Sequence, residues 1–280
     1  MTRETRYAKT ADGAFIAYQV VGDGPVDFAA DFHAFAGNVD LIWDEPDWGP
    51  FVVGFAEFTR LVIHDRRGSG ASTRNVPPPN LETRAADLLA VLDEIGSEAP
   101  VLGAAASTGA MHALFAATYP DRTSGFVWNY PRARLAWAPD YPWGGKDEAV
   151  FEEWLAGWRR EWGKPYSLEV WAPSVADDPQ FRQWWAKYLR LGASPSAVVT
   201  LFRMNREIDV RPILPVIRVP TLVLHRVVIA LATPARAVTW LSIFPVQSSS
   251  SFQARIICGG SATQMPLLTK LRSSSPESGV

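Results

Sequence analysis

A short run of small residues around one serine offers the clearest chemistry in this sequence. The run reads Gly-Ala-Ala-Ala-Ser-Thr-Gly-Ala-Met and lies between an expected strand and an expected helix. A serine on such a sharp turn is lifted above the sheet, where its hydroxyl can attack a carbonyl carbon, and the N–H group of the following residue, Thr108, helps to stabilise the oxyanion. The neighbours Ala105, Ala106 and Gly109 are small enough for the turn to close. Ser107 is therefore a candidate nucleophile.

Ser107 also has a purely structural interpretation, as the N-cap of the helix that follows it. A serine at this position accepts a hydrogen bond from a backbone N–H group two or three residues further along. Because both roles need the same residue type at the same place, the local sequence leaves the two interpretations open.

Two other loops could complete a site around this turn. Phe32 and His33 follow an early expected strand, at a point where serine hydrolases place a second oxyanion donor. We expect one of these residues to donate its backbone N–H group, and the His33 side chain to be a pocket or surface residue. Asp65 and Arg66 follow another strand, and we expect them to fix a loop through ion pairs.

The spacing of the histidines and of the cysteine gives no metal or redox site. The four histidines are far apart in the sequence, and Cys258 is the only cysteine. We therefore expect no disulfide, no metal ion and no cofactor, in keeping with a reducing cytoplasm.

The elements that position these residues alternate between strands and helices. Residues 6–21 form an expected hairpin at Asp12-Gly13, with both strands at the edge of the sheet. Further strands are expected at 26–30, 59–64, 100–104, 126–128 and 220–225, and helices at 81–95 and 108–119. This order predicts an α/β fold, a three-layer sandwich with a mainly parallel sheet and an N-terminal hairpin.

An insertion rich in tryptophan interrupts this alternation. Nine of the twelve tryptophans lie between Trp128 and Trp185, several at helical spacing. We expect a core at 1–131, a helical cap at 132–212, a last recognisable core strand at 213–226 and an atypical tail at 227–280. The rings either pack the cap onto the sheet or line an apolar pocket.

The overall composition narrows the class of partner. Lysine and arginine number 27 against 29 for aspartate and glutamate, and 48% of the 280 residues are hydrophobic. No basic stripe, secretion signal or membrane-spanning run is visible, so we expect neither nucleic acid nor a membrane as partner. A small apolar or ester-like molecule fits best.

Several longer motifs resemble a known family. They are the D-R-R-G-S-G-A-S loop at 65–72, L-F-A-A-T-Y-P-D-R at 114–122, and the segments at 208–211 and 219–226. Together they resemble the α/β-hydrolase domains that precede class III adenylate/guanylate cyclase domains in actinobacteria, and the likeness covers 6–226. The resemblance implies an α/β-hydrolase fold and a relation to a cyclase domain that this chain lacks.

The resemblance also bears on the nucleophile. An ungapped alignment on the L-F-A-A-T-Y-P motif puts the family's nucleophilic serine at Ala106 and its first elbow glycine at Thr108. A shift by one residue restores Ser107 but conflicts with that motif. The family's acid and base lie beyond the strand that ends at His225, yet residues 227–280 contain no histidine and no aspartate.

The likeness ends abruptly at Arg226, and a reading-frame shift at that point is our hypothesis for the loss. In the alternative frame, Val228-Ile229 can encode an aspartate, and 255–258 can encode D-H-L, in the order in which the family has its acid and its base. The other interpretation is an unrelated natural tail. In both cases we expect the last native strand to be missing, the sheet edge uncovered and the tail poorly ordered.

Three functions therefore compete. The first is a hydrolase of small ester-type substrates with Ser107 as nucleophile. The second is a catalytically inactive ligand-sensing or regulatory domain, and the third a truncated or frameshifted product without function.

Overall fold

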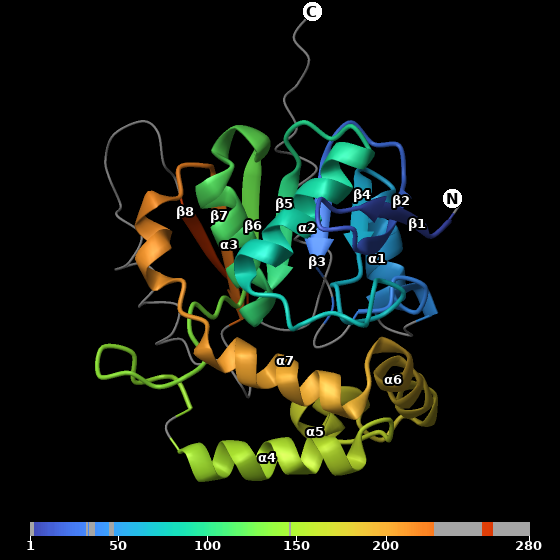
Figure 1. The fold of residues 1–280 in the computed structure, drawn as a ribbon, viewed down its shortest axis with the longest axis vertical. Helices are drawn as coiled ribbons and strands as arrows, with labels where there is room; N and C mark the ends of the chain where they lie inside the picture. Colours follow the sequence, from blue (N-terminus) through green and yellow to red (C-terminus); the bar gives the residue numbers. More distant parts are fainter. Residues whose placement is uncertain are drawn as a thin grey trace, which may run out of the picture.

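An eight-stranded sheet organises the protein, with helices on both of its faces (Figure 1). This computed structural model describes residues 3–31, 33, 37–44, 48–145, 147–226 and 254–259. The strand order is β1-β2-β4-β3-β5-β6-β7-β8. The strands are β1 (Arg6–Lys9), β2 (Phe15–Val21), β3 (Asp27–Asp31), β4 (Arg60–His64), β5 (Val101–Ala105), β6 (Gly125–Asn129), β7 (Thr221–Arg226) and β8 (Ala254–Gly259).

The hairpin at the N-terminus forms as its sequence predicts. Strands β1 and β2 pair antiparallel, and Gly13 has a positive φ of 87° in the turn between them. Of the two hairpin strands, however, β1 alone lies at an edge of the sheet, because β2 also pairs antiparallel with β4. The expectation that both hairpin strands lie at the edge is therefore wrong. From β4 to β8 every pairing is parallel.

Three helices cover the two faces of the sheet: α1 (Trp48–Ala56), α2 (Leu81–Glu94) and α3 (Gly109–Thr118). Alternation along β4 divides the core between the faces, since Val62 packs with α2 and α3 whereas Leu61 and Ile63 pack with α1. The Asn80 side chain caps α2 as predicted, accepting from the Thr83 N–H at 2.8 Å. Short 3-10 turns complete the core: η1 (Ile42–Asp44), η2 (Ala106–Thr108), η3 (Pro120–Arg122) and η5 (Arg211–Val216).

The cap is a helical layer beneath the carboxyl ends of the parallel strands (Figure 1). Its elements are α4 (Glu148–Glu161), α5 (Leu168–Trp171), η4 (Pro173–Val175), α6 (Pro179–Gly192) and α7 (Pro195–Glu207). Trp158 is fully buried at the centre of an aromatic cluster that includes Trp154 and Trp185. These rings pack the cap helices against one another and not onto the strands of the sheet, which differs from both interpretations of the tryptophans.

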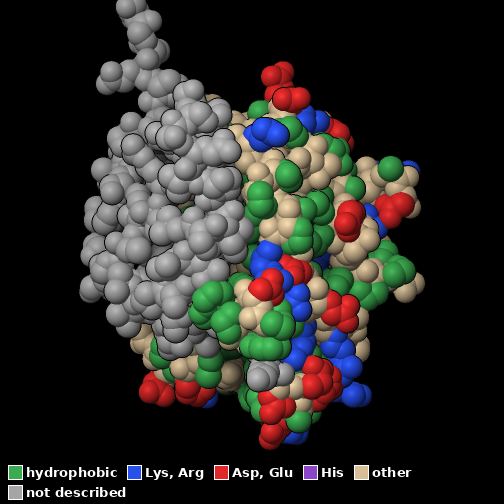
Figure 2. Space-filling view, turned by 90° about the vertical axis from the view of Figure 1, so that its left-hand side faces the viewer, with side chains coloured by type: hydrophobic (Ala, Val, Ile, Leu, Met, Phe, Trp, Pro, Cys, Tyr) green, Lys and Arg blue, Asp and Glu red, His purple; other side chains and the backbone are tan. Residues whose placement is uncertain are grey.

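The surface agrees with the nearly balanced charge of the sequence. Figure 2 shows acidic and basic side chains interspersed over the described part of one face. Within the described residues, no helix is both long enough and apolar enough to cross a membrane.

The sheet does not end at β7, as we expected from the sequence of the tail. Strand β8 pairs in parallel with β7, from Thr221 opposite Ala254 to Arg226 opposite Gly259. The prediction that β7 forms an uncovered edge is therefore wrong. The rest of the tail, 227–253 and 260–280, lies outside the described residues.

Candidate functional site

The turn between β5 and α3 has the sharp geometry that its sequence predicts. Strand β5 ends at Ala105, the 3-10 turn η2 follows, and α3 begins at Gly109. Ala106 has a φ of +47°, one of three positive values among the described non-glycine residues. An L-residue in this conformation costs on the order of 1–3 kcal/mol, and such strain is found where a turn must hold a functional group. The strained position here carries a methyl group.

The side chain of Trp128, from β6, holds this strained turn in place. Its Nε1–H group donates a hydrogen bond of 2.7 Å to the carbonyl oxygen of Ala106. The indole ring is fully buried and lies so close to Gly109 that a Cβ atom there would overlap its Nε1 atom. Glycine is therefore required at position 109 by close packing, because its own φ of −67° is an ordinary helical value.

Ser107 follows the strained residue and is half-buried. The N-cap interpretation of Ser107 is wrong, because Ala105 precedes η2 and Thr108 is the residue before α3. Among the described residues the Ser107 hydroxyl has no hydrogen-bond partner. Thr108 is bound to the turn itself, since its Oγ1 donates to the Ala105 carbonyl at 2.7 Å and accepts from the Ala105 N–H at 3.2 Å.

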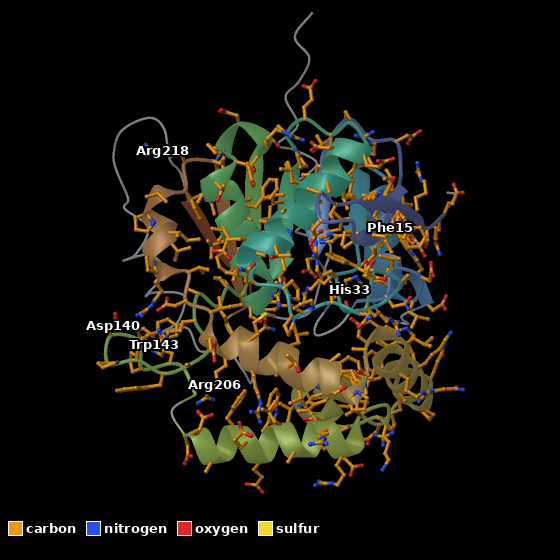
Figure 3. All side chains as sticks on the ribbon, viewed as in Figure 1. Phe15, His33, Asp140, Trp143, Arg206 and Arg218 are labelled. Carbon is orange, nitrogen blue, oxygen red and sulfur yellow. The ribbon has the colours of Figure 1, made fainter. Side chains whose placement is uncertain are left out.

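His33 lies at the lower end of the sheet, above the cap helices (Figure 3). It is 2% exposed, so it is not a surface residue. Its backbone N–H group donates to Asp31 Oδ1 at 3.1 Å and is therefore already engaged. On the ring, Nε2 is 3.5 Å from Asp65 Oδ1 and Nδ1 is 3.5 Å from the Tyr188 hydroxyl, which belongs to α6 of the cap. Phe32, the other expected oxyanion donor, lies outside the described residues.

Burial shifts the protonation of this pair in opposite directions. It lowers the pKa of His33 to about 4, because the imidazolium is disfavoured away from water. It raises the pKa of Asp65 to about 7, although the N–H groups of Ala71 and Val39 stabilise the carboxylate. His33 is therefore neutral at pH 7, the form in which an imidazole can accept a proton.

Asp65 and Arg66 do not pair with each other, since each has a different partner. Arg66 donates through Nε and Nη2 to Asp31 Oδ2, at 3.0 and 2.8 Å. Burial alone would raise the pKa of Asp31, but the Arg66 guanidinium and the nearby histidines outweigh it and hold that pKa far below its usual range. Asp65 fixes its own loop instead, by accepting from the Ala71 N–H at 2.8 Å.

A second buried ion pair extends this charged cluster. Arg67 donates to both carboxylate oxygens of Asp87, at 2.9 Å from Nε to Oδ2 and 2.5 Å from Nη2 to Oδ1, and it also binds Asp12. Helix α2, which contains Asp87, also contains Arg84, and the Arg84 side chain is only 7% exposed. Sequence reasoning missed Arg84 and Asp87. The available signal was their place on the apolar stripe of that helix, since Arg84 lies four residues before Leu88 and Asp87 four residues before Val91.

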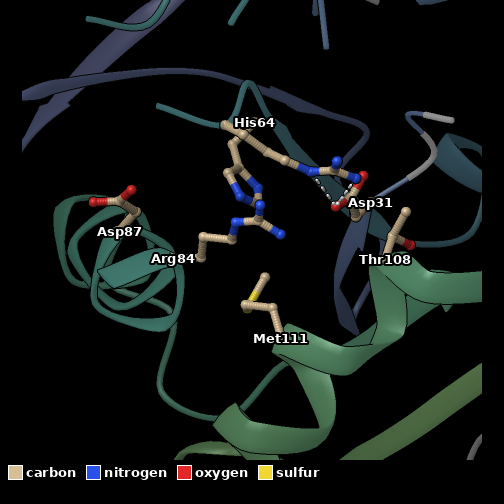
Figure 4. Close-up of a pocket in the computed structure, with 7 residues that line it drawn as sticks. Asp31, His64, Arg84, Asp87, Thr108 and Met111 are labelled. Carbon is tan, nitrogen blue, oxygen red and sulfur yellow. Dashed lines mark hydrogen bonds and ion pairs between the residues drawn. The ribbon is translucent and has the colours of Figure 1, made fainter. Parts of the chain in front are cut away.

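A cavity of about 10 Å³ opens within this cluster, directly behind the turn (Figure 4). Such a volume holds about one water molecule, far less than the several hundred Å³ of a typical small-molecule pocket. Its lining is formed by Asp31, His64, Arg66, Arg84, Asp87, Thr108 and Met111. The cavity is therefore too small for an ester substrate.

Two further histidines are buried near the turn. Burial lowers the pKa of His112, to about 4, and that of His64. The ring of His112 has one contact to the turn, with Nδ1 3.5 Å from the Thr108 carbonyl oxygen. The backbone of His225 lies in β7, one residue before its end, and its side chain is outside the description. Among the described side chains, no three His, Cys, Asp or Glu residues are placed to hold a metal ion.

Comparison with solved structures identifies the architecture. The protein superimposes on a bromoperoxidase from Bacillus anthracis with a TM-score of 0.71 and 21% identity, over 92% of each chain. It also matches an esterase from Rhodococcus sp., with a TM-score of 0.70, 21% identity and coverage of 96% of this chain and 97% of that one. An esterase from Exiguobacterium antarcticum gives a TM-score of 0.71 at 16% identity over 97% of each chain.

The chain has the α/β-hydrolase fold. No protein-family model and no curated protein sequence matches it. At these identities the structural likeness establishes the fold, including the mainly parallel sheet and the helical cap predicted from the sequence.

Proposed function

We propose that this α/β-hydrolase-fold protein is a slow hydrolase of small ester-type substrates, with Ser107 as its nucleophile. The observation that carries the proposal is the hydroxyl of Ser107, half-buried on the β5–α3 turn and without a hydrogen-bond partner among the described residues. The esterases that share the fold support this reaction class.

In the proposed reaction, Ser107 Oγ attacks the carbonyl carbon of the ester and its proton passes to solvent water. The backbone N–H of Thr108 stabilises the oxyanion, and the alcohol leaves as the tetrahedral intermediate collapses. Water then cleaves the acyl-enzyme, which releases the carboxylic acid and restores the Ser107 hydroxyl.

The rate should be low, since no histidine contacts Ser107 in the described structure. Enzymes stripped of their triad still accelerate hydrolysis by about 10³–10⁴-fold over water, through the oxyanion hole and binding alone. We expect an acceleration of that order for this protein.

A serine-directed fluorophosphonate tests the proposal at the level of the residue. Intact-protein mass spectrometry should show one adduct on the wild type and none on Ser107→Ala. Ser251, in the tail, gives a matched control, because Ser251→Ala should retain the adduct. An unlabelled wild type, or labelling that survives Ser107→Ala, would overturn the proposal.

A second candidate is a non-catalytic domain that senses a small apolar ligand, related to the cyclase-linked domains that the sequence resembles. The observation that favours it is Ala106, since the strained residue of the turn has a methyl group in place of a hydroxyl. This candidate predicts a wild type without turnover and a rise in melting temperature with an apolar ligand. It also predicts that Ala106→Ser creates reactivity toward the fluorophosphonate.

The loss of the expected acid and base is the subject of a separate proposal, a reading-frame shift near Arg226. Its support is the abrupt end of the family resemblance and the strings that the other frame can encode. The nucleotide sequence tests it: codons 227–280 must be able to encode an aspartate and D-H-L one base earlier. Codons that exclude either string would end the hypothesis.

A further inference from the structure

Arg84 is a buried guanidinium that has no carboxylate partner within the described part of the chain. Its Nη1 and Nη2 atoms each lie 3.2 Å from Asn205 Oδ1, and Nη2 also lies 3.7 Å from the sulfur of Met204. Its Nε–H group has no partner among the described residues. Asn205 and Met204 belong to α7, so Arg84 lies where the core helix α2 meets the cap.

The charges around Arg84 do not balance within the buried cluster. Asp31 is already bound by Arg66, and Asp87 by Arg67, so neither carboxylate is available to Arg84. Asp12 also binds Arg67 but is 59% exposed. The buried groups thus comprise three arginines against Asp31, Asp65 and Asp87, and the pKa of Asp65, raised by burial to about 7, leaves that carboxyl only partly ionised at neutral pH.

The excess positive charge persists at neutral pH. Burial lowers the pKa of Arg84 to about 9, which still leaves the side chain charged at pH 7. A buried charge without a counter-charge is costly unless a counter-ion accompanies it.

The water-sized cavity gives such an ion a place to bind. Figure 4 shows the Arg84 guanidinium beneath the ring of His64, on the side that faces Asp31 and Thr108. His64 Nδ1 is a second buried nitrogen without a partner among the described residues. His64 is 3% exposed and Arg84 7% exposed, so two nearly inaccessible polar groups line one space of about 10 Å³.

We propose that this cavity binds one monatomic inorganic anion of chloride size, held by Arg84 and His64. The Arg84 Nε–H and the His64 Nδ1–H donate to the ion, which supplies the missing negative charge. Asp31 and Asp87 face the same space, but the arginines bound to them offset their repulsion. A polyatomic anion such as sulfate or gluconate is excluded, because the cavity holds about one water molecule.

The cavity shares Thr108 with the proposed hydrolytic turn, but Ser107 does not line it, so the ion would not take part in the hydrolysis. Its expected effect is on stability, since an ion bound to Arg84 joins α2 to the cap helix α7 through Asn205. Binding to the folded state alone raises the melting temperature in a saturable manner.

Thermal unfolding of the full chain in chloride and in gluconate, at one pH and one ionic strength, tests the proposal. The wild type should melt about 2–4 °C higher in saturating chloride. Arg84→Met should lose this difference. Arg60→Met, which removes a partly exposed arginine paired with Asp27, should keep it. An equal melting temperature for the wild type in both salts, or a chloride effect that persists in Arg84→Met, would refute the site.

A crystal of the wild type grown in bromide gives a test that needs no variant. The proposal predicts an anomalous peak in the cavity, within hydrogen-bonding distance of Arg84 Nε and His64 Nδ1. Density without anomalous signal there would identify a water molecule and overturn the proposal, whatever the fluorophosphonate experiment shows for Ser107.

Discussion

The ion pair between Asp31 and Arg66 should be the most sensitive electrostatic contact behind the candidate site. Asp31 is 2% exposed and accepts from Arg66 Nε, Arg66 Nη2 and the His33 N–H. Asp31→Asn preserves the shape of the side chain but leaves the Arg66 guanidinium buried without its counter-charge. Breaking a buried pair in this way costs about 3–5 kcal/mol.

Strand β3 contains a matched control in Asp27, which pairs with Arg60 through two hydrogen bonds of 2.5 and 2.7 Å. The side chains of that pair are 20% and 33% exposed, so solvent screens the interaction. Asp27→Asn should therefore cost about 0–1 kcal/mol. Urea unfolding, followed by tryptophan fluorescence at pH 7, measures both values. If Asp27→Asn destabilises the protein as much as Asp31→Asn, burial does not set the strength of these pairs.

Two other predictions concern the buried histidines and the turn. The pKa values of His33 and His112, about 4, lie below the ordinary value of 6.5, so their contribution to stability is complete above pH 6.5 and is lost as the pH falls toward 4. The raised pKa of Asp65 changes the free energy of unfolding in the opposite direction over the same pH range, so a variant must be compared with the wild type. In urea unfolding, His112→Leu should lose less stability than the wild type as the pH falls from 6.5 to 4. An equal loss in both proteins would contradict the lowered pKa of His112. Trp128→Phe should cost about 2–4 kcal/mol, because it leaves the Ala106 carbonyl without its donor and opens a void in a packed core. A loss below about 1 kcal/mol would show that the indole N–H does not hold the turn.

Several parts of the fold could be predicted from short stretches of adjacent residues. The turn at Asp12-Gly13 and the Asn80 cap each depend on a few adjacent residues, and both form as predicted. The place of the β5–α3 turn also followed from small residues between a strand and a helix. These features need no knowledge of distant contacts.

The parts that sequence reasoning missed depend on contacts between distant segments. Asp31 ends strand β3 whereas Arg66 lies in the loop after β4, and the interactions of Arg84 with Asn205 join residues that are 121 positions apart. Charged residues usually lie at the surface, and this general rule argued against burying Arg84 in spite of its place on the apolar stripe of α2. The pairing of β8 with β7 was missed for a similar reason, since the tail shows no clear strand period.

The identity of the strained residue is an intermediate case. The family alignment singled out Ala106, whereas the local motif singled out Ser107, and a shift by one residue changes which side chain stands at the tightest point of the turn. Backbone geometry gives the positive φ to Ala106. The hydroxyl group therefore belongs to the next residue, Ser107, and whether this hydroxyl reacts decides between hydrolase and inactive domain.

The steady-state hydrolysis of p-nitrophenyl butyrate by the wild type, Ser107→Ala and Ala106→Ser addresses that question most directly. The proposed function predicts slow turnover by the wild type, on the order of 10³–10⁴-fold above the uncatalysed rate, and a lower rate in Ser107→Ala, which cannot form the acyl-enzyme and keeps only what the oxyanion hole and binding supply. Equal rates for the wild type and Ser107→Ala would contradict it, and turnover confined to Ala106→Ser would show that the turn retains its geometry but has lost its nucleophile.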